Sequence, residues 1–280
     1  VEDPTRILRA IRFEQRFNFR IDGQTQRLVK NAVQLKLFHK LSGARLTHEL
    51  QLMLEEENVL ECLNRLQDLK LLEAIHPLLT LDADRLRVLS EVHKVHTWYK
   101  LLYLEPAAST WRLYLLGLTM GLERDQLEHV CLRLRFSDRE LREFLALRDQ
   151  LGEALARLMT WQDGLSALSE IYFTLAPLPV EGVLFLMARS RREAIRKNIS
   201  LYLTRMRAQQ LFIDGDDLKA LGLQSGPVFA RILRQVRAAA VDGEAFSREK
   251  QLELAKTLMQ TLRDEGWENS PPQRNGRGHR

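Results

Sequence analysis

Apolar residues recur three or four positions apart along nearly the whole chain, which is the spacing of one face of an α-helix. Examples are Leu60, Leu63 and Leu66 and, further on, Leu141, Phe144 and Leu145. The 280 residues include only 14 glycines and 8 prolines, most of which fall between these apolar stripes, and no segment alternates as a half-buried strand does. The pattern predicts an all-α protein of about a dozen helices without a substantial sheet.

Residues that favour helix starts mark several boundaries. Asp3 followed by Pro4 is typical of an N-cap and a first helical position. We also expect helices to begin at Ser42 and run through Glu57, to begin at Ser137 and run to about Leu158, and to begin at Asp163. Residues 269–280 (NSPPQRNGRGHR) lack apolar anchors and are predicted to form a flexible basic tail.

The composition excludes several classes of protein. Apolar residues make up 45% and charged residues 28% of the chain, as in an ordinary globular domain. Cys62 and Cys131 are too few for a disulfide scaffold and are typical of core thiols in a reducing compartment. No apolar run approaches the ~18–20 residues that a membrane span needs. We therefore expect a cytoplasmic protein with no membrane partner.

The formal net charge of +5 is distributed unevenly along the chain. Residues 1–50 hold 10 basic and 5 acidic side chains, residues 51–180 hold 14 and 20, and residues 181–240 hold 11 and 5. A polyanion such as RNA would be attracted to the two basic zones and repelled by the acidic middle. The alternative is that the basic zones are ordinary solvated helix faces, and charge alone does not decide between the two.

The most informative segment is residues 2–13 (EDPTRILRAIRF). Arg6, Arg9 and Arg12 are three positions apart, so they share one helix face with some drift, and Asp3 lies one turn before Arg6. Carboxylate acceptors and guanidinium donors converging at a helix start suit a nucleotide, whose base edge and phosphates they can bind. The alternative is an ordinary capped helix with a local Asp3–Arg6 ion pair, which contributes only a few tenths of a kcal/mol.

Three motifs in order resemble the class II tRNA nucleotidyltransferase and bacterial poly(A) polymerase family. The first is the nucleotide-selecting motif Glu-Asp-x-x-Arg at residues 2–6 with its following arginines and Phe13. The second is residues 41–50 (LSGARLTHEL), in which a Ser, an Arg and a Glu-Leu pair recur at the family's spacing. The third is residues 215–227 (GDDLKALGLQSGP), followed by residues 241–244 (VDGE). Ala44 departs from the family, which usually has an acidic residue there.

The resemblance implies an elongated multi-helix array of neck, body and tail. Residues 1–69 would be the nucleotide-selecting and neck helices, 70–200 the helical body, 201–268 the RNA-binding helical tail, and 269–280 the flexible tail. The family's catalytic head has a Gly-rich turn, paired metal-binding aspartates and an Arg-Asp motif, and this chain contains none of them. Because the chain also begins at Val1 without a methionine, we expect a fragment that lacks the head. Mg²⁺ would then bind in the absent head, and this chain would hold no metal or catalytic residue.

The resemblance also assigns roles to single residues. Asp3 and Arg6 would pair with the base of the incoming CTP or ATP, Asp3 accepting from the exocyclic amine that both bases carry. Arg9 and Arg12 would lie at the nucleotide or brace the motif, and Arg45 would hold its helix against a neighbour. UTP and GTP present a carbonyl in place of the amine and would leave polar groups unpaired.

Two groups of residues in the second half are candidates for RNA contacts. They are Arg191, Arg192, Arg196 and Lys197 in one patch, and Ser225, Gly226, Arg231 and Arg234 at the third motif and the helix after it. Backbone N–H groups at such a helix start, together with arginines along one face, suit RNA phosphates. Solvated basic faces are the alternative.

Three other patterns are interpreted as structural. His93 and His96 have a metal-like spacing but lack a third ligand nearby. The acidic cluster at Asp214, Asp216 and Asp217 is predicted to cap a helix, and five aromatic residues have the spacing of core-facing side chains: Trp98, Tyr99, Tyr103, Trp111 and Tyr114.

The sequence therefore leads to one principal hypothesis and one alternative. The principal hypothesis is the C-terminal part of a nucleotidyltransferase that adds C and/or A residues to tRNA 3′ ends, with tRNA and ATP or CTP as partners. The alternative is a non-catalytic helical RNA-binding module.

Overall fold

The computed structural model describes residues 3–161, 167–224 and 226–264, and every regular element in these ranges is helical. The predicted all-α class is therefore confirmed for the described residues. The elements are α1 (Thr5–Arg16), α2 (Gly23–Gln34), a 3₁₀ turn η1 (Leu37–Lys40), α3 (Gly43–Leu54), α4 (Val59–Asp68), α5 (Leu71–Ile75), α6 (Ala83–Leu101), α7 (Thr110–Leu118), α8 (Arg124–Arg133), α9 (Asp138–Thr160), α10 (Leu168–Leu175), α11 (Val180–Arg189), α12 (Glu193–Leu201), a π-helical turn η2 (Tyr202–Met206), α13 (Gly215–Ala220), α14 (Pro227–Val241) and α15 (Arg248–Asp264).

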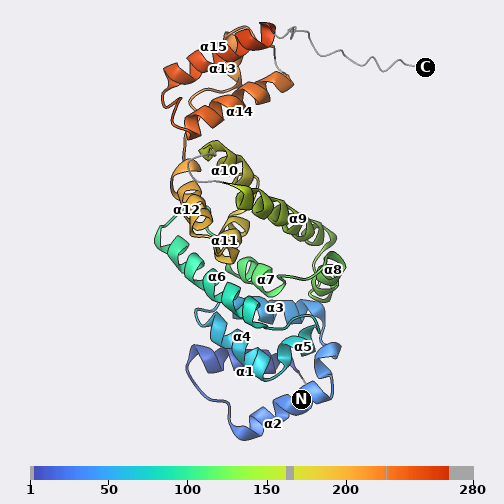
Figure 1. The fold of residues 1–280 in the computed structure, drawn as a ribbon. Coiled ribbons are helices and arrows are strands. Elements are labelled where there is room, and N and C mark those ends of the chain that lie inside the picture. Colours follow the sequence, from blue (N-terminus) through green and yellow to red (C-terminus); the bar gives the residue numbers. More distant parts are fainter. Residues whose placement is uncertain (1–2, 162–166, 225, 265–280) are drawn as a thin grey trace, which may run out of the picture. The chain divides into compact units, whose positions relative to one another are not determined.

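The helices form two compact units (Figure 1). The first contains the described residues within 1–159 and 178–196, and the second contains those within 160–177 and 197–280. The predicted segment boundaries at residues 69 and 200 stay predictions.

The first unit buries two sets of helix contacts. In one, α1 packs against α3 and α4, and the fully buried Leu8, Ile11 and Leu46 belong to these helices. In the other, α6 packs against α7 and α11. Burying these apolar stripes stabilises the unit, because each fully buried large aliphatic side chain contributes ~1.5–3 kcal/mol.

The second unit is built on α14. Helices α10 and α15 both pack against α14, and the core includes Leu218 of α13, Ile232 and Val236 of α14 and Ala255 of α15, all fully buried. Asp214 accepts hydrogen bonds from the backbone N–H groups of Asp216 and Asp217, so the predicted helix cap is confirmed at the start of α13.

Other local predictions have mixed outcomes. Helix α3 begins directly after Ser42 but ends at Leu54, short of Glu57. Helix α9 begins after Ser137, whose N–H and hydroxyl both donate to the Glu140 carboxylate. The predicted helix start at Asp163 and the predicted flexible tail at 269–280 lie outside the described residues.

The predicted core-facing aromatic set is wrong at one position. Tyr99 and Tyr114 are buried, whereas Tyr103 is 90% exposed. Tyr103 lies beyond the end of α6 with a φ of 50°, where the left-handed backbone ends the helical periodicity on which the prediction depended.

Among the described helices, none is both long and apolar enough to cross a membrane by itself. Helices α10 and α11 meet the length and composition test only as a bent pair.

Candidate functional site

A cleft of about 540 Å³ lies between the N-terminal half of α1 and the first two turns of α3. Its lining brings together residues of the first two sequence motifs: Asp3, Thr5, Arg6, Arg9, Ala44, Arg45, His48 and Glu49. Because α1 and α3 pack against each other, motifs about 40 residues apart in sequence form one polar site.

Asp3 is held at the mouth of the cleft by two neighbours. Its Oδ1 accepts hydrogen bonds from the Thr5 N–H (3.0 Å) and the Thr5 hydroxyl (2.7 Å), and its Oδ2 accepts one from Arg45 Nη2 at 2.7 Å. These contacts, those from Thr5 most of all, lower the pKa of the Asp3 carboxyl below its usual value. Asp3 is therefore an ionised acceptor at neutral pH, and its salt-bridge partner is Arg45 on α3 rather than Arg6.

Arg6 and Arg9 differ in how firmly they are held. The exposed Arg6 side chain makes no hydrogen bond or ion pair within the described ranges, so its guanidinium donors are free for a ligand. Arg9 Nη1 lies 3.6 Å from Glu49 Oε1, and more than half of the Arg9 side chain remains exposed.

Arg12 does not line the cleft. Its Nη1 donates to Glu56 Oε1 at 2.9 Å, and only 10% of its side chain is exposed. The reason is helical geometry, since each step of three residues turns the side chain about 60° back around the axis, and two steps carry Arg12 about 120° away from Arg6. Of the two roles considered for Arg12, its placement fits a brace at the end of α3.

Thr5, His48 and Glu49 line the cleft and have no role in the sequence predictions. Glu49 lies one turn after Arg45 on α3, and only 7% of its side chain is exposed. Its Oε2 is buried without a hydrogen-bond partner among the described residues. The i, i+4 spacing of Arg45 and Glu49 was the signal available, since it places both on one face of the predicted helix.

Hydrogen bonds between segments that are distant in sequence hold α1 and α3, the two helices that line the cleft. Arg65 on α4 donates to both carboxylate oxygens of Glu14 on α1. Arg133 at the end of α8 donates to the carbonyl oxygens of Phe38 and Leu41, just before α3 begins. Thr47 on α3 donates from its hydroxyl to the Leu134 carbonyl oxygen.

The predicted RNA contacts of the first unit are arginines with partners, of which Arg191 and Arg192 are exposed and Arg196 is half-buried. Arg191 Nη2 lies 3.0 Å from Asp84 Oδ1, and Arg196 Nη1 lies 2.7 Å from Glu91 Oε2. Arg192 donates to the carbonyl oxygen of Met159. These bonds fix the direction of each guanidinium and leave its other donors available.

The remaining predicted RNA contacts belong to the second unit. Lys197, Gly226, Arg231 and Arg234 are all exposed, and Gly226 precedes the first residue of α14. The Arg234 guanidinium lies 4.4 Å from the centre of the Phe173 ring on α10. Ser225 lies outside the described residues.

Within the described ranges, no three His, Cys, Asp or Glu residues are grouped so that they could hold a metal ion. His93 Nδ1 lies 3.0 Å from the Tyr114 hydroxyl oxygen. Burial lowers the pKa of His96, with Lys100 and His93 adding to the effect.

Comparisons with known proteins match both sequence and fold. A family model described as the probable RNA and SrmB-binding site of polymerase A matches residues 18–82. An A-adding tRNA nucleotidyltransferase of Geobacter sulfurreducens is 41% identical over 92% of this chain. The chain spans about 30% of that relative's length.

Two solved structures share the fold. The Thermotoga maritima CCA-adding enzyme in complex with tRNA has a TM-score of 0.75 and 24% identity, over 93% of this chain and 62% of that one. A tRNA-processing enzyme with CTP has a TM-score of 0.69 and 26% identity, over 86% and 63%. Together with the three ordered motifs, these similarities confirm the resemblance seen in the sequence. The chain belongs to the family of class II tRNA nucleotidyltransferases and bacterial poly(A) polymerases.

Proposed function

We propose that this chain is the part of a tRNA nucleotidyltransferase that selects the incoming nucleotide and holds the tRNA while C and/or A residues are added to its 3′ end. The observation that carries the proposal is the cleft between α1 and α3, where a fixed carboxylate and an unpaired guanidinium face the same space. The names of the relatives, A-adding and CCA-adding enzymes, support the choice of substrate.

Base selection follows from the chemistry of Asp3 and Arg6. Asp3 is ionised and can only accept, so it favours the exocyclic amine of cytosine or adenine, while Arg6 donates to ring acceptors. A uracil or guanine carbonyl facing Asp3 would leave polar groups unpaired at ~1–3 kcal/mol each, roughly 5- to 150-fold in selectivity.

Tertiary contacts keep this site in place. Arg45 orients Asp3, and the buried Arg12–Glu56 pair fixes α1 against the end of α3. The family implies Mg²⁺, but the described residues offer no group of ligands that fits a metal ion. No step of the proposed function is therefore assigned to a metal on this chain.

RNA binding is proposed for the predicted basic residues of both units, all of which are exposed except the half-buried Arg196. Arg191, Arg192 and Arg196 are in the first unit, and Lys197, Arg231 and Arg234 are in the second. Contacts of this kind neutralise phosphates, so tRNA binding should weaken steeply as salt is raised.

The test is a chimera of the Geobacter relative in which its aligned segment is replaced by this chain. We expect the chimera to add nucleotides to tRNA, and Arg6→Ala to abolish its preference for ATP or CTP over UTP and GTP. Arg142→Ala, which changes an exposed arginine on α9 outside the cleft, is the matched control. An unchanged base preference in Arg6→Ala would contradict the proposed templating.

The chain alone is expected to bind tRNA without extending it in the presence of ATP, CTP and Mg²⁺. If it extended tRNA, the proposal that this chain selects the nucleotide and binds tRNA without catalysing the addition would be wrong. The alternative function, a non-catalytic RNA-binding module, predicts that the folded chimera binds tRNA and adds none of the four nucleotides.

A further inference from the structure

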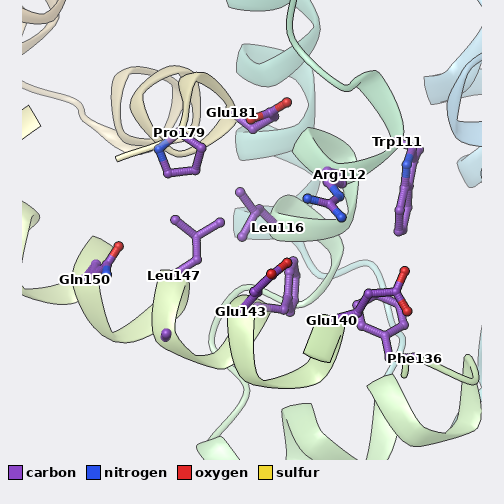
Figure 2. Close-up of a pocket in the computed structure, with 12 residues that line it drawn as sticks. Trp111, Arg112, Leu116, Phe136, Glu140, Glu143, Leu147, Gln150, Pro179 and Glu181 are labelled. Atoms are coloured by element: carbon purple, nitrogen blue, oxygen red, sulfur yellow. The ribbon is translucent and has the colours of Figure 1, made fainter. Parts of the chain in front are cut away.

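A second cavity, of about 340 Å³, lies in the first unit between α7, α9 and the start of α11 (Figure 2). It shares no lining residue with the cleft between α1 and α3. Neither the sequence motifs nor the proposed function uses any of its residues.

The apolar wall of this cavity is aromatic. The rings of Trp111 and Phe136 meet edge to face with centroids 6.1 Å apart, and Phe136 meets Phe144 in the same way at 5.8 Å. The fully buried Leu116 and the side chain of Leu147 complete the apolar surface (Figure 2). Aromatic rings packed edge to face in this way form a rigid surface for an apolar or cationic group.

Three carboxylates complete the lining, and each has one oxygen held in place. Glu140 Oε2 accepts from the N–H and hydroxyl of Ser137, Glu143 Oε1 accepts from Arg139 Nε at 2.8 Å, and Glu181 Oε1 accepts from the Ser109 N–H at 2.6 Å. The second oxygen of each carboxylate has no hydrogen-bond partner in the described part of the chain. The hydrogen bonds from Ser137 lower the pKa of Glu140, so its carboxyl is ionised at neutral pH.

One cation, Arg112, already lies at this cavity. Figure 2 shows its side chain among Glu181, Glu143 and Trp111, and its guanidinium lies 5.9 Å from the centre of the Trp111 ring. It makes no ion pair closer than 4 Å with any described carboxylate. Three carboxylates against Arg112 and the Arg139 side chain paired with Glu143 leave this region net negative by one charge, in a protein whose formal net charge is +5.

We propose that this cavity binds a small organic cation, an alkyl diamine whose ammonium groups contact the free carboxylate oxygens and whose stem lies on the aromatic wall. Ammonium groups are attracted to the negative faces of aromatic rings, and carboxylates supply acceptors for their N–H donors. Glu140 and Glu143 lie one turn apart on α9 and Glu181 lies on α11, so carboxylates on two helices line the cavity for the two ends of a diamine. Nucleotides are disfavoured here, because their phosphates would face three carboxylates.

The test is an NMR titration of the ¹⁵N-labelled chain with putrescine at low ionic strength. The reporter is the indole N–H of Trp111, assigned by its disappearance in Trp111→Phe. We expect a saturable shift with putrescine and none with butanediol, which has the same stem but no charge. A linear, non-saturating response, or an equal response to the diol, would overturn the proposal.

Variants that are expected to change putrescine binding in opposite directions extend the test. Glu143→Gln should weaken putrescine binding about three- to fivefold, the effect of removing one exposed ion pair. Glu153→Gln, on the same helix but outside the cavity, should leave the dissociation constant unchanged. Arg112→Met should tighten binding about threefold or more, because it removes the competing cation. All three side chains are exposed, so the variants should keep the fold, which circular dichroism checks.

If Glu143→Gln and Glu153→Gln weakened putrescine binding equally, binding would depend only on diffuse surface charge. If Arg112→Met weakened putrescine binding, the diamine would not compete with Arg112. Either result contradicts the proposed site. Neither depends on nucleotide addition, so the outcome is separate from that of the proposed function.

Discussion

Arg6 and Arg12 have the same residue type and lie on the same helix, yet their substitution should have opposite consequences. Arg12→Met removes the 2.9 Å bond to Glu56 and leaves a carboxylate whose side chain is only 14% exposed. Breaking a buried ion pair from one side costs ~3–5 kcal/mol. Arg16 Nη1 remains 3.7 Å from the same Glu56 oxygen, so we expect the lower end, about 3 kcal/mol.

Differential scanning calorimetry of the whole chain measures this loss. A loss of 1 kcal/mol lowers the Tm of a 150–250-residue unit by about 2–4 °C, so Arg12→Met should lower the Tm of the first unit by roughly 6–12 °C. Arg6→Ala changes an exposed side chain without a partner in the described chain, and should stay within ~0.5 kcal/mol of the wild type. In the chimera, Arg12→Met should keep the base preference at a temperature where it is folded, whereas Arg6→Ala should lose it.

A double-mutant cycle with Glu56→Gln separates the pair from other effects. The two substitutions together should cost less than their sum, because each removes the same interaction. The reasoning is refuted if Arg12→Met leaves the Tm within about 2 °C of the wild type and abolishes base preference, since Arg12 would then act at the nucleotide.

Three further predictions concern other parts of the first unit. Gly43→Ala should lower the free energy of unfolding by at least ~3 kcal/mol, because a Cβ there would lie 2.5 Å from a backbone carbonyl oxygen of α8. Gly152→Ala would place its Cβ where nothing lies within 4 Å, and should raise the free energy of unfolding by ~0.5–1 kcal/mol through the better helix propensity of Ala in α9. Urea unfolding measures both changes. In an NMR titration the Asp3 carboxyl should have a pKa below its usual value, and Thr5→Val should raise that pKa, because it removes the Thr5 hydroxyl bond that lowers the pKa most. Burial lowers the pKa of His96, so as the pH falls the unfolded chain takes up a proton at His96 before the folded chain does. The free energy of unfolding should therefore fall as the pH drops below about 6.5, and His96→Gln should reduce this pH dependence.

Much of the local structure could be predicted from short stretches of sequence. The all-α class follows from periodicity, and the starts of α3, α9 and α13 follow from Ser42, Ser137 and Asp214. Such features depend on contacts within a turn or two, where residue type and spacing decide the outcome. The prediction for Tyr103 was wrong because its own left-handed backbone ends the helical period of apolar residues. The neighbouring residue types do not indicate that conformation.

The candidate site could be predicted in part. The sequence by itself determined that Asp3 and Arg6 lie at a helix start and that a helix begins directly after Ser42. Only the tertiary structure decided their partners. Arg45 pairs with Asp3 across 42 positions of the chain, Arg12 pairs with Glu56 across 44 positions, and Glu49 is buried beside Arg9. The physical reason is that helix spacing sets the angle between side chains, whereas the packing of α3 and α4 on α1 decides which angles face solvent and which face a charge.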